Sequence, residues 1–159
     1  VVQNTESSRS FSVSLCVPLK LLKTACVYCL KDKNREMKTD IKNRNDIEKL
    51  TNTFYGKIKT DTTIGYFFTD VAKVNWEEHL SRMYDFWENI MFANGNYSGN
   101  PMIKHKELHQ KSEMTEAHFQ HWNALFNETV DELFTGKKAE EIKQRARNIS
   151  AVLMYKTIG

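Results

Sequence analysis

Five histidines lie between positions 79 and 121 and are the first candidates for metal chemistry. They are His79, His105, His109, His118 and His121. An imidazole is a common metal ligand and titrates near neutral pH. His118 and His121 lie three residues apart and could share a metal, but no carboxylate stands at the Glu-x-x-His spacing of di-iron bundles. We therefore assign those two to structural roles.

Motifs of other site types are missing from the sequence or incomplete. It has no HExxH pattern, no nucleophile motif and no glycine-rich phosphate loop, so peptidase, hydrolase and nucleotide-binding functions have no support. Cys26-x-x-Cys29 is one isolated pair, and a zinc site needs four ligands, so we interpret these cysteines and Cys16 as free thiols. A net charge of +3 and the lack of a long apolar run indicate no nucleic-acid partner and no membrane span.

Three polar side chains lie inside strongly apolar stretches and suggest a different kind of site. Tyr55 follows Phe54, His79 lies three residues after Trp76, and Trp122 stands in an aromatic run. A flat apolar cofactor such as haem needs this kind of lining, one neutral imidazole for its iron and hydrogen-bond donors opposite. The competing interpretation is that these aromatics are only core residues, which is usual for apolar stripes on helices.

The apolar spacing predicts a chain of helices that positions these residues. Apolar residues recur in steps of three and four from Asp46, until Gly65 and a run of three aromatics interrupt them. A second helix starts at Asn75, where Asn75-x-x-Glu78 resembles a capping box. A loop at 94–101, a short helix after Pro101, a helix from near Thr115 that ends at Gly136, and a last helix from Ala139 to Leu153 follow. The predicted class is all-α, with five or six helices and no internal repeat.

Residues 1–36 differ from the rest of the chain. They hold the three cysteines, six of the 23 basic residues and three of the 20 acidic residues, which leaves 17 of each charge in 37–159. Their apolar stretch is broken by Pro18 and two lysines, unlike a signal peptide. We interpret 1–36 as a non-domain extension, disordered or not native, and 37–159 as the domain, with Met37 as a plausible native first residue.

The run from Asp46 to Leu153 resembles a truncated haemoglobin, most closely the group III branch. The matching features form an ordered set along the chain. They are Phe54-Tyr55, Gly65 with Phe67-Phe68, Trp76-Glu77-Glu78-His79, Phe86-Trp87, Tyr97-Ser98-Gly99-Asn100-Pro101 with His105, His118-Phe119, Trp122 and Leu125-Phe126. The glycine pairs of other truncated branches are missing, as in group III. The resemblance implies a shortened globin, a two-over-two helical sandwich around haem b.

The same resemblance assigns roles to individual residues. The proximal iron ligand falls on His105, four residues after Pro101, with His109 one turn further on as the alternative. The distal side is expected to carry Tyr55, His79 and Trp122. The rest of the pocket lining is expected to include Phe54, Met83 and Phe68, with Phe67 as the alternative to Phe68. Arg82 and Lys104 could meet the haem propionates.

The function implied is reversible binding of dioxygen, nitric oxide or another small diatomic ligand in the cytoplasm. One alternative is enzymatic, a nitric oxide dioxygenase or a peroxidase-like activity that needs an electron donor, because the distal pocket decides between ligand binding and activation. A second alternative is a haem-free helical interaction module in which the aromatics are only core. Carrier and enzyme need the same residues, so the sequence does not separate them.

Overall fold

The computed structural model describes residues 37–94 and 96–159, and the compact unit within them is Lys38–Gly159. Its helices are α2 (Arg44–Thr60), α3 (Trp76–Phe92), α4 (Pro101–Lys111), α5 (Glu116–Leu133) and α6 (Lys137–Ile158), with a π-helical turn, η2 (Phe67–Val71), between α2 and α3. The described residues are thus all-α, as predicted. The predicted extension and its cysteines lie outside the described residues.

Side-chain caps explain where the helices begin. Asn43 accepts hydrogen bonds from the first turn of α2, and Asp46 accepts one from the backbone of Asn43, which completes a capping box. Asn75 caps α3 by accepting from the N–H of Glu78, so the predicted start is confirmed. Asn100 caps α4, whose first residue is Pro101, a position where the missing N–H costs nothing. Thr115 caps α5, again as expected.

The end predicted for α5 at Gly136 is wrong. That helix ends at Leu133, and Gly136 is the N-cap of α6 with a φ of 139°. The carboxylate of Asp40 accepts hydrogen bonds from the N–H groups of Lys138 and Ala139, at 3.0 and 2.9 Å, and so caps α6 from a distant part of the chain. A Cβ at position 136 would collide with that carboxylate. Glycine is therefore needed at a helix start, although it is more common after a helix end.

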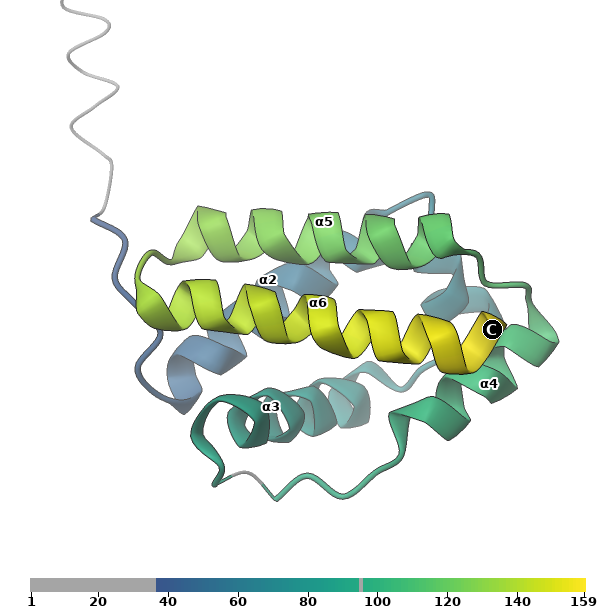
Figure 1. Ribbon diagram of the computed structural model, residues 1–159, viewed down its shortest axis with the longest axis horizontal. Coiled ribbons are helices and arrows are strands. Elements are labelled where there is room, and N and C mark those ends of the chain that lie inside the picture. Colours follow the sequence, from purple (N-terminus) through teal and green to yellow (C-terminus); the bar gives the residue numbers. More distant parts are fainter. Residues whose placement is uncertain (1–36, 95) are drawn as a thin grey trace, which may run out of the picture. The chain divides into compact units, whose positions relative to one another are not determined.

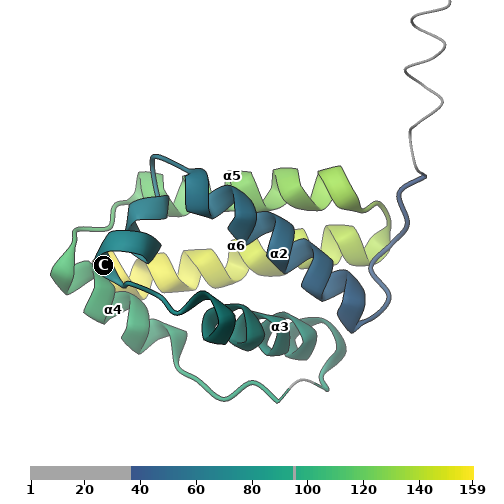
Figure 2. The same cartoon turned by 180° about the vertical axis from the view of Figure 1, so that it is seen from behind.

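Two helix pairs form the body of the domain. α5 packs along α6, α2 packs on α3, and α2 also contacts α5. Figure 1 shows α5 and α6 in front, and Figure 2, from behind, shows α2 and α3 in front of them. The short α4 packs on α6 and on η2 rather than extensively on α3. The side chains that are most completely buried lie between the pairs and include Phe54, Phe126, Leu50, Ile58, Val130 and Ile142.

No helix in the described part of the chain is long and apolar enough to cross a membrane.

Candidate functional site

His79 lies among aromatic rings from α2, η2 and its own helix. The ring of Tyr55 is perpendicular to the imidazole, with centroids 4.8 Å apart. Phe68 and Trp76 approach the same imidazole edge-on at 5.9 and 6.1 Å. Each also contacts Tyr55, at 5.8 and 6.2 Å. We call Tyr55, Phe68, Trp76 and His79 the distal cluster.

The imidazole of His79 is neutral at physiological pH. Burial, and to a smaller extent the positive charge of Arg82 and a charge on His105, lower its pKa to about 4. The Nε2 atom of His79 is buried and has no hydrogen-bond partner in the structure. A buried polar atom without a partner is costly, which indicates a place for a polar ligand beside it.

Tyr55 connects the distal cluster to the core. Burial raises the pKa of its hydroxyl, so this group stays protonated and able to donate a hydrogen bond. Its neighbour Phe54 contacts it edge-on at 5.1 Å and reaches Trp122 at 5.2 Å. Trp122 in turn stacks on Phe126, with ring planes only 9° apart. Both predicted donors, Tyr55 and Trp122, thus contact the ring of Phe54.

His105 is oriented by its own helix. Its Nδ1 lies 2.7 Å from the carbonyl oxygen of Pro101, one turn earlier in α4. A carbonyl only accepts hydrogen bonds, so Nδ1 carries the proton and Nε2 keeps its lone pair. Burial lowers the pKa of His105, while the hydrogen bond to Pro101 acts in the opposite direction. The ring lies 6.5 Å from that of Phe119 on α5, tilted by 31°. Nε2 therefore has the protonation state of a metal ligand.

His109 has the opposite arrangement. Its Nδ1 accepts a hydrogen bond of 2.9 Å from the backbone N–H of Met114. A neutral imidazole carries one proton, so in His109 that proton is on Nε2, which is then unable to bind a metal. Freeing Nε2 would break the bond to Met114, which ties the end of α4 to the start of α5.

Two further pocket residues differ in what they touch. Phe68 belongs to the distal cluster, whereas the ring contacts of Phe67 are with Tyr66 and His118. Of the two phenylalanines considered from the sequence, Phe68 is thus the one beside His79. Met83, one turn after His79 on α3, packs partly buried against the core.

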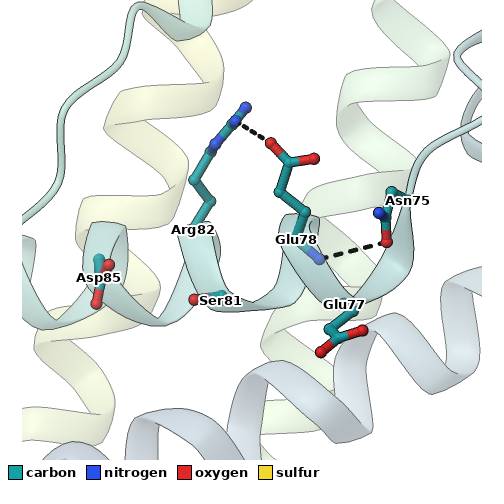
Figure 3. A pocket seen from close by; sticks show the side chains of 6 residues that line it. All are labelled: Asn75, Glu77, Glu78, Ser81, Arg82 and Asp85. Atoms are coloured by element: carbon teal, nitrogen blue, oxygen red, sulfur yellow. Dashed lines mark hydrogen bonds and ion pairs between the residues drawn. The ribbon is translucent and has the colours of Figure 1, made fainter.

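Arg82 and Lys104 are exposed and bonded to acidic side chains within their own helices. Arg82 pairs with Glu78, and Lys104 pairs with Glu107 at 2.9 Å. Figure 3 shows Arg82 reaching toward Glu78 at a shallow hollow of about 420 Å³ on the outer face of α3. Its lining is polar and charged, so this hollow does not suit an apolar cofactor.

A second hollow, of about 290 Å³, opens between α3, α4 and α6. All but one of its lining residues are apolar: Phe86, Ile90, Pro101, Met102, Asn148, Ile149, Val152 and Leu153. Because Pro101 also anchors His105, this apolar space adjoins the predicted proximal side.

The remaining histidines have structural partners. His118 accepts a hydrogen bond from the N–H of Thr115 at the start of α5, and Nε2 of His121 lies 2.7 Å from the carboxylate of Asp61. No group of three or more histidine, cysteine, aspartate or glutamate side chains is arranged to hold a metal ion within 37–94 and 96–159.

The structure adds Trp76 and Phe119 to the residues selected from the sequence. Trp76 lies three residues before His79, and Phe119 lies three before Trp122, so each shares a helix face with a predicted site residue. That spacing could have identified both.

Comparisons with known proteins identify the family of this chain. The chain matches the bacterial-like globin family over residues 40–155. It is 29% identical over 118 residues to the group 3 truncated haemoglobin of Campylobacter jejuni. The matched region covers 72% of this chain and 91% of that protein. The crystal structure of a group III truncated haemoglobin from C. jejuni matches with a TM-score of 0.68 and 27% identity, over 76% of this chain and 95% of that chain. The fold predicted from the sequence is confirmed.

Proposed function

Because this chain belongs to the bacterial-like globin family and is thus a haem-binding globin, we propose that it binds dioxygen or another small diatomic ligand, with His105 as the proximal iron ligand. The observation that carries the proposal is the hydrogen bond between His105 Nδ1 and the carbonyl of Pro101. It fixes the proton on Nδ1 and leaves Nε2 free, as an axial ligand requires.

The residues of the site fit a haem. Nε2 of His105 offers one neutral nitrogen, and the unpartnered Nε2 of His79 marks a polar position near it. Phe68 lies beside His79, Phe119 lies beside His105, and Phe54 lies beside Tyr55, so each of these polar groups has an aromatic neighbour that supplies apolar surface. The haem would supply an iron with a sixth position open to a small ligand.

The chain's own groups then determine what binds in that position. The hydroxyl of Tyr55 and the indole N–H of Trp122 donate hydrogen bonds to a ligand that carries partial negative charge. His79 stays neutral because of its burial and adds no charge to the pocket. Phe54 and Phe68 exclude water, which strengthens the remaining hydrogen bonds. Arg82 and Lys104 are exposed, and we propose that they exchange their acidic partners for the haem carboxylates.

The unpartnered Nε2 of His79 favours one second candidate. A neutral imidazole can accept a proton from hydrogen peroxide, as a peroxidase requires. This function, like nitric oxide dioxygenation, also needs an electron donor. Family membership favours both haem functions over a haem-free helical module.

Titration of the purified full chain with haem tests the proposal. We expect one haem per chain, an intense absorption band at the violet edge of the visible spectrum, and a shift of that band when carbon monoxide is added to the reduced protein. The proposed function would be ruled out if the chain takes up no haem, or if the absorption band does not shift when carbon monoxide is added. Peroxide turnover with an added reductant would separate the second candidate from a carrier.

A further inference from the structure

The distal cluster meets the surface at Trp76, and a lysine covers it there. Nζ of Lys59 lies 4.4 Å from the centroid of the Trp76 ring, the shortest of the cation–π contacts among the described residues. Lys59 is at the C-terminal end of α2, whereas Trp76 is the first residue of α3. The contact therefore joins two helices on the outside of the pocket.

Trp76 also has an inner contact surface that reaches every other member of the distal cluster. It stacks on Phe68, with centroids 6.1 Å apart and planes 22° apart, and meets Tyr55 and His79 edge-on. The indole is only half-buried, so it forms the boundary between His79 and water.

We infer that Trp76, held by Lys59, is a positioning residue that closes the solvent side of the distal cluster and keeps the His79 ring inside the pocket. This inference deepens the proposed function and rests on it. When the indole swings away, water and ligands reach the cluster; when Lys59 holds it, access is confined to brief openings. The contact thus sets how fast a small ligand enters and leaves, and has little effect on how tightly Tyr55 and Trp122 hold it.

The inference predicts faster exchange of the ligand at an unchanged affinity. In the haem-loaded chain, K59M keeps the length of the side chain and removes the charge, so the open form becomes more populated. We expect carbon monoxide association after flash photolysis to accelerate roughly two- to fivefold, the population change expected from losing a surface cation–π contact. Because the indole controls entry and exit alike, the dissociation rate should rise by the same factor, and the affinity for carbon monoxide should stay at the parent value. K59R retains a cation that can stack on the indole and should restore the parent rate. K42M, which removes an exposed lysine elsewhere on the domain, is the matched control.

A second measurement does not depend on haem. In the full chain before haem is added, with helicity checked by circular dichroism, K59M should increase quenching of tryptophan fluorescence by acrylamide. In a W76F background the same substitution should have no effect, which assigns the change to Trp76 rather than Trp87 or Trp122.

The outcomes are distinguishable. If the parent chain binds no haem, the proposed function fails, and the quenching result decides by itself whether Lys59 shields Trp76. If quenching in K59M equals that of the parent, the contact is not formed and the inference is wrong. If quenching rises but association stays at the parent rate, Trp76 is surface packing only, and its assigned role is also wrong.

Discussion

The Nδ1 atom of His105 and the carbonyl oxygen of Pro101 lie 2.7 Å apart within one turn of α4. Four residues separate them, the spacing that places a side chain over the preceding turn of a helix. The contact decides the tautomer of the imidazole and directs its free nitrogen away from the helix backbone. His109, one turn later, accepts at Nδ1 instead, from Met114.

Replacing these two histidines should have unequal effects on the haem spectrum. H105A removes the proposed axial nitrogen and should shift the main absorption band of the carbon monoxide complex. H109A should leave its position unchanged, because in that residue Nε2 carries a proton. Absorption spectra of the two haem-loaded variants provide the comparison. A shifted band in H109A and a normal one in H105A would transfer the ligand role to His109.

Removing the hydroxyl of Tyr55 should weaken retention of dioxygen. One net hydrogen bond contributes about 0.5–1.5 kcal/mol, so Y55F should release dioxygen roughly two- to tenfold faster. Stopped-flow displacement by carbon monoxide measures this rate. Y66F is the control, because Tyr66 stacks on Phe67 outside the distal cluster. An unaltered dissociation rate in Y55F would contradict the donor role.

Acid should destabilise the folded chain partly through His79. The folded pKa is about 4 and the ordinary value is 6.5, so between these values the unfolded chain holds a proton that the folded chain does not. The free energy of unfolding therefore falls as pH drops through this window, by up to about 1.4 kcal/mol per pH unit. His105, whose pKa is also lowered, acts in the same direction.

Urea unfolding of the full chain without added haem, near pH 7 and near pH 5, measures this slope. H79F lacks the titrating group and should lose less stability on acidification than the parent. Carboxylates titrate in both proteins, so the difference between the slopes isolates His79. Equal slopes would show that His79 is protonated as easily in the folded chain as in the unfolded one.

Truncating Phe126 should be severely destabilising. This ring is fully buried and contacts Phe54, Trp87 and Trp122, at 5.2, 4.8 and 5.2 Å. F126A should lower the free energy of unfolding by about 3–5 kcal/mol, because it leaves a cavity between the helix pairs. Y155A, at a side chain that is 69% exposed, should change it by less than about 0.5 kcal/mol. Denaturant midpoints compare the two, and similar losses would argue against this core.

Two glycine-to-alanine substitutions should act in opposite directions. G136A forces a side chain into a positive φ and against the carboxylate of Asp40, and should cost more than about 1 kcal/mol. G56A lies in the middle of α2, where a Cβ would meet nothing within 4 Å, and should stabilise by about 0.5–1 kcal/mol. Thermal unfolding distinguishes the signs. Stabilisation by G136A would mean that Asp40 does not cap α6.

The helices could be predicted from the sequence, and the candidate site residues could be proposed from it, because their signals are local. Steps of three and four residues mark a buried helix face, and Asn75, Pro101 and Thr115 mark helix starts whatever the rest of the chain does. The position of His105 after Pro101 is also a local feature. Gly136 shows the limit of such signals, because glycine is compatible with either side of a helix boundary, and only the distant Asp40 identifies which side it occupies.

Which helix faces meet is decided by the tertiary structure. The sequence leaves His105 and His109 as alternatives, since both lie on one face of one helix. They differ in what their Nδ1 atoms touch, and for His109 that partner lies beyond the helix. The cluster of Tyr55, Phe68, Trp76 and His79 likewise forms only when α2, η2 and α3 pack together. The periodicity of apolar residues specifies which face of a helix is buried but not which helix it packs against. The hydrophobic effect is non-directional, so any apolar surface can serve as the partner. Sequence alone thus determined the helices and the chemical groups, and packing determined the cluster that they form.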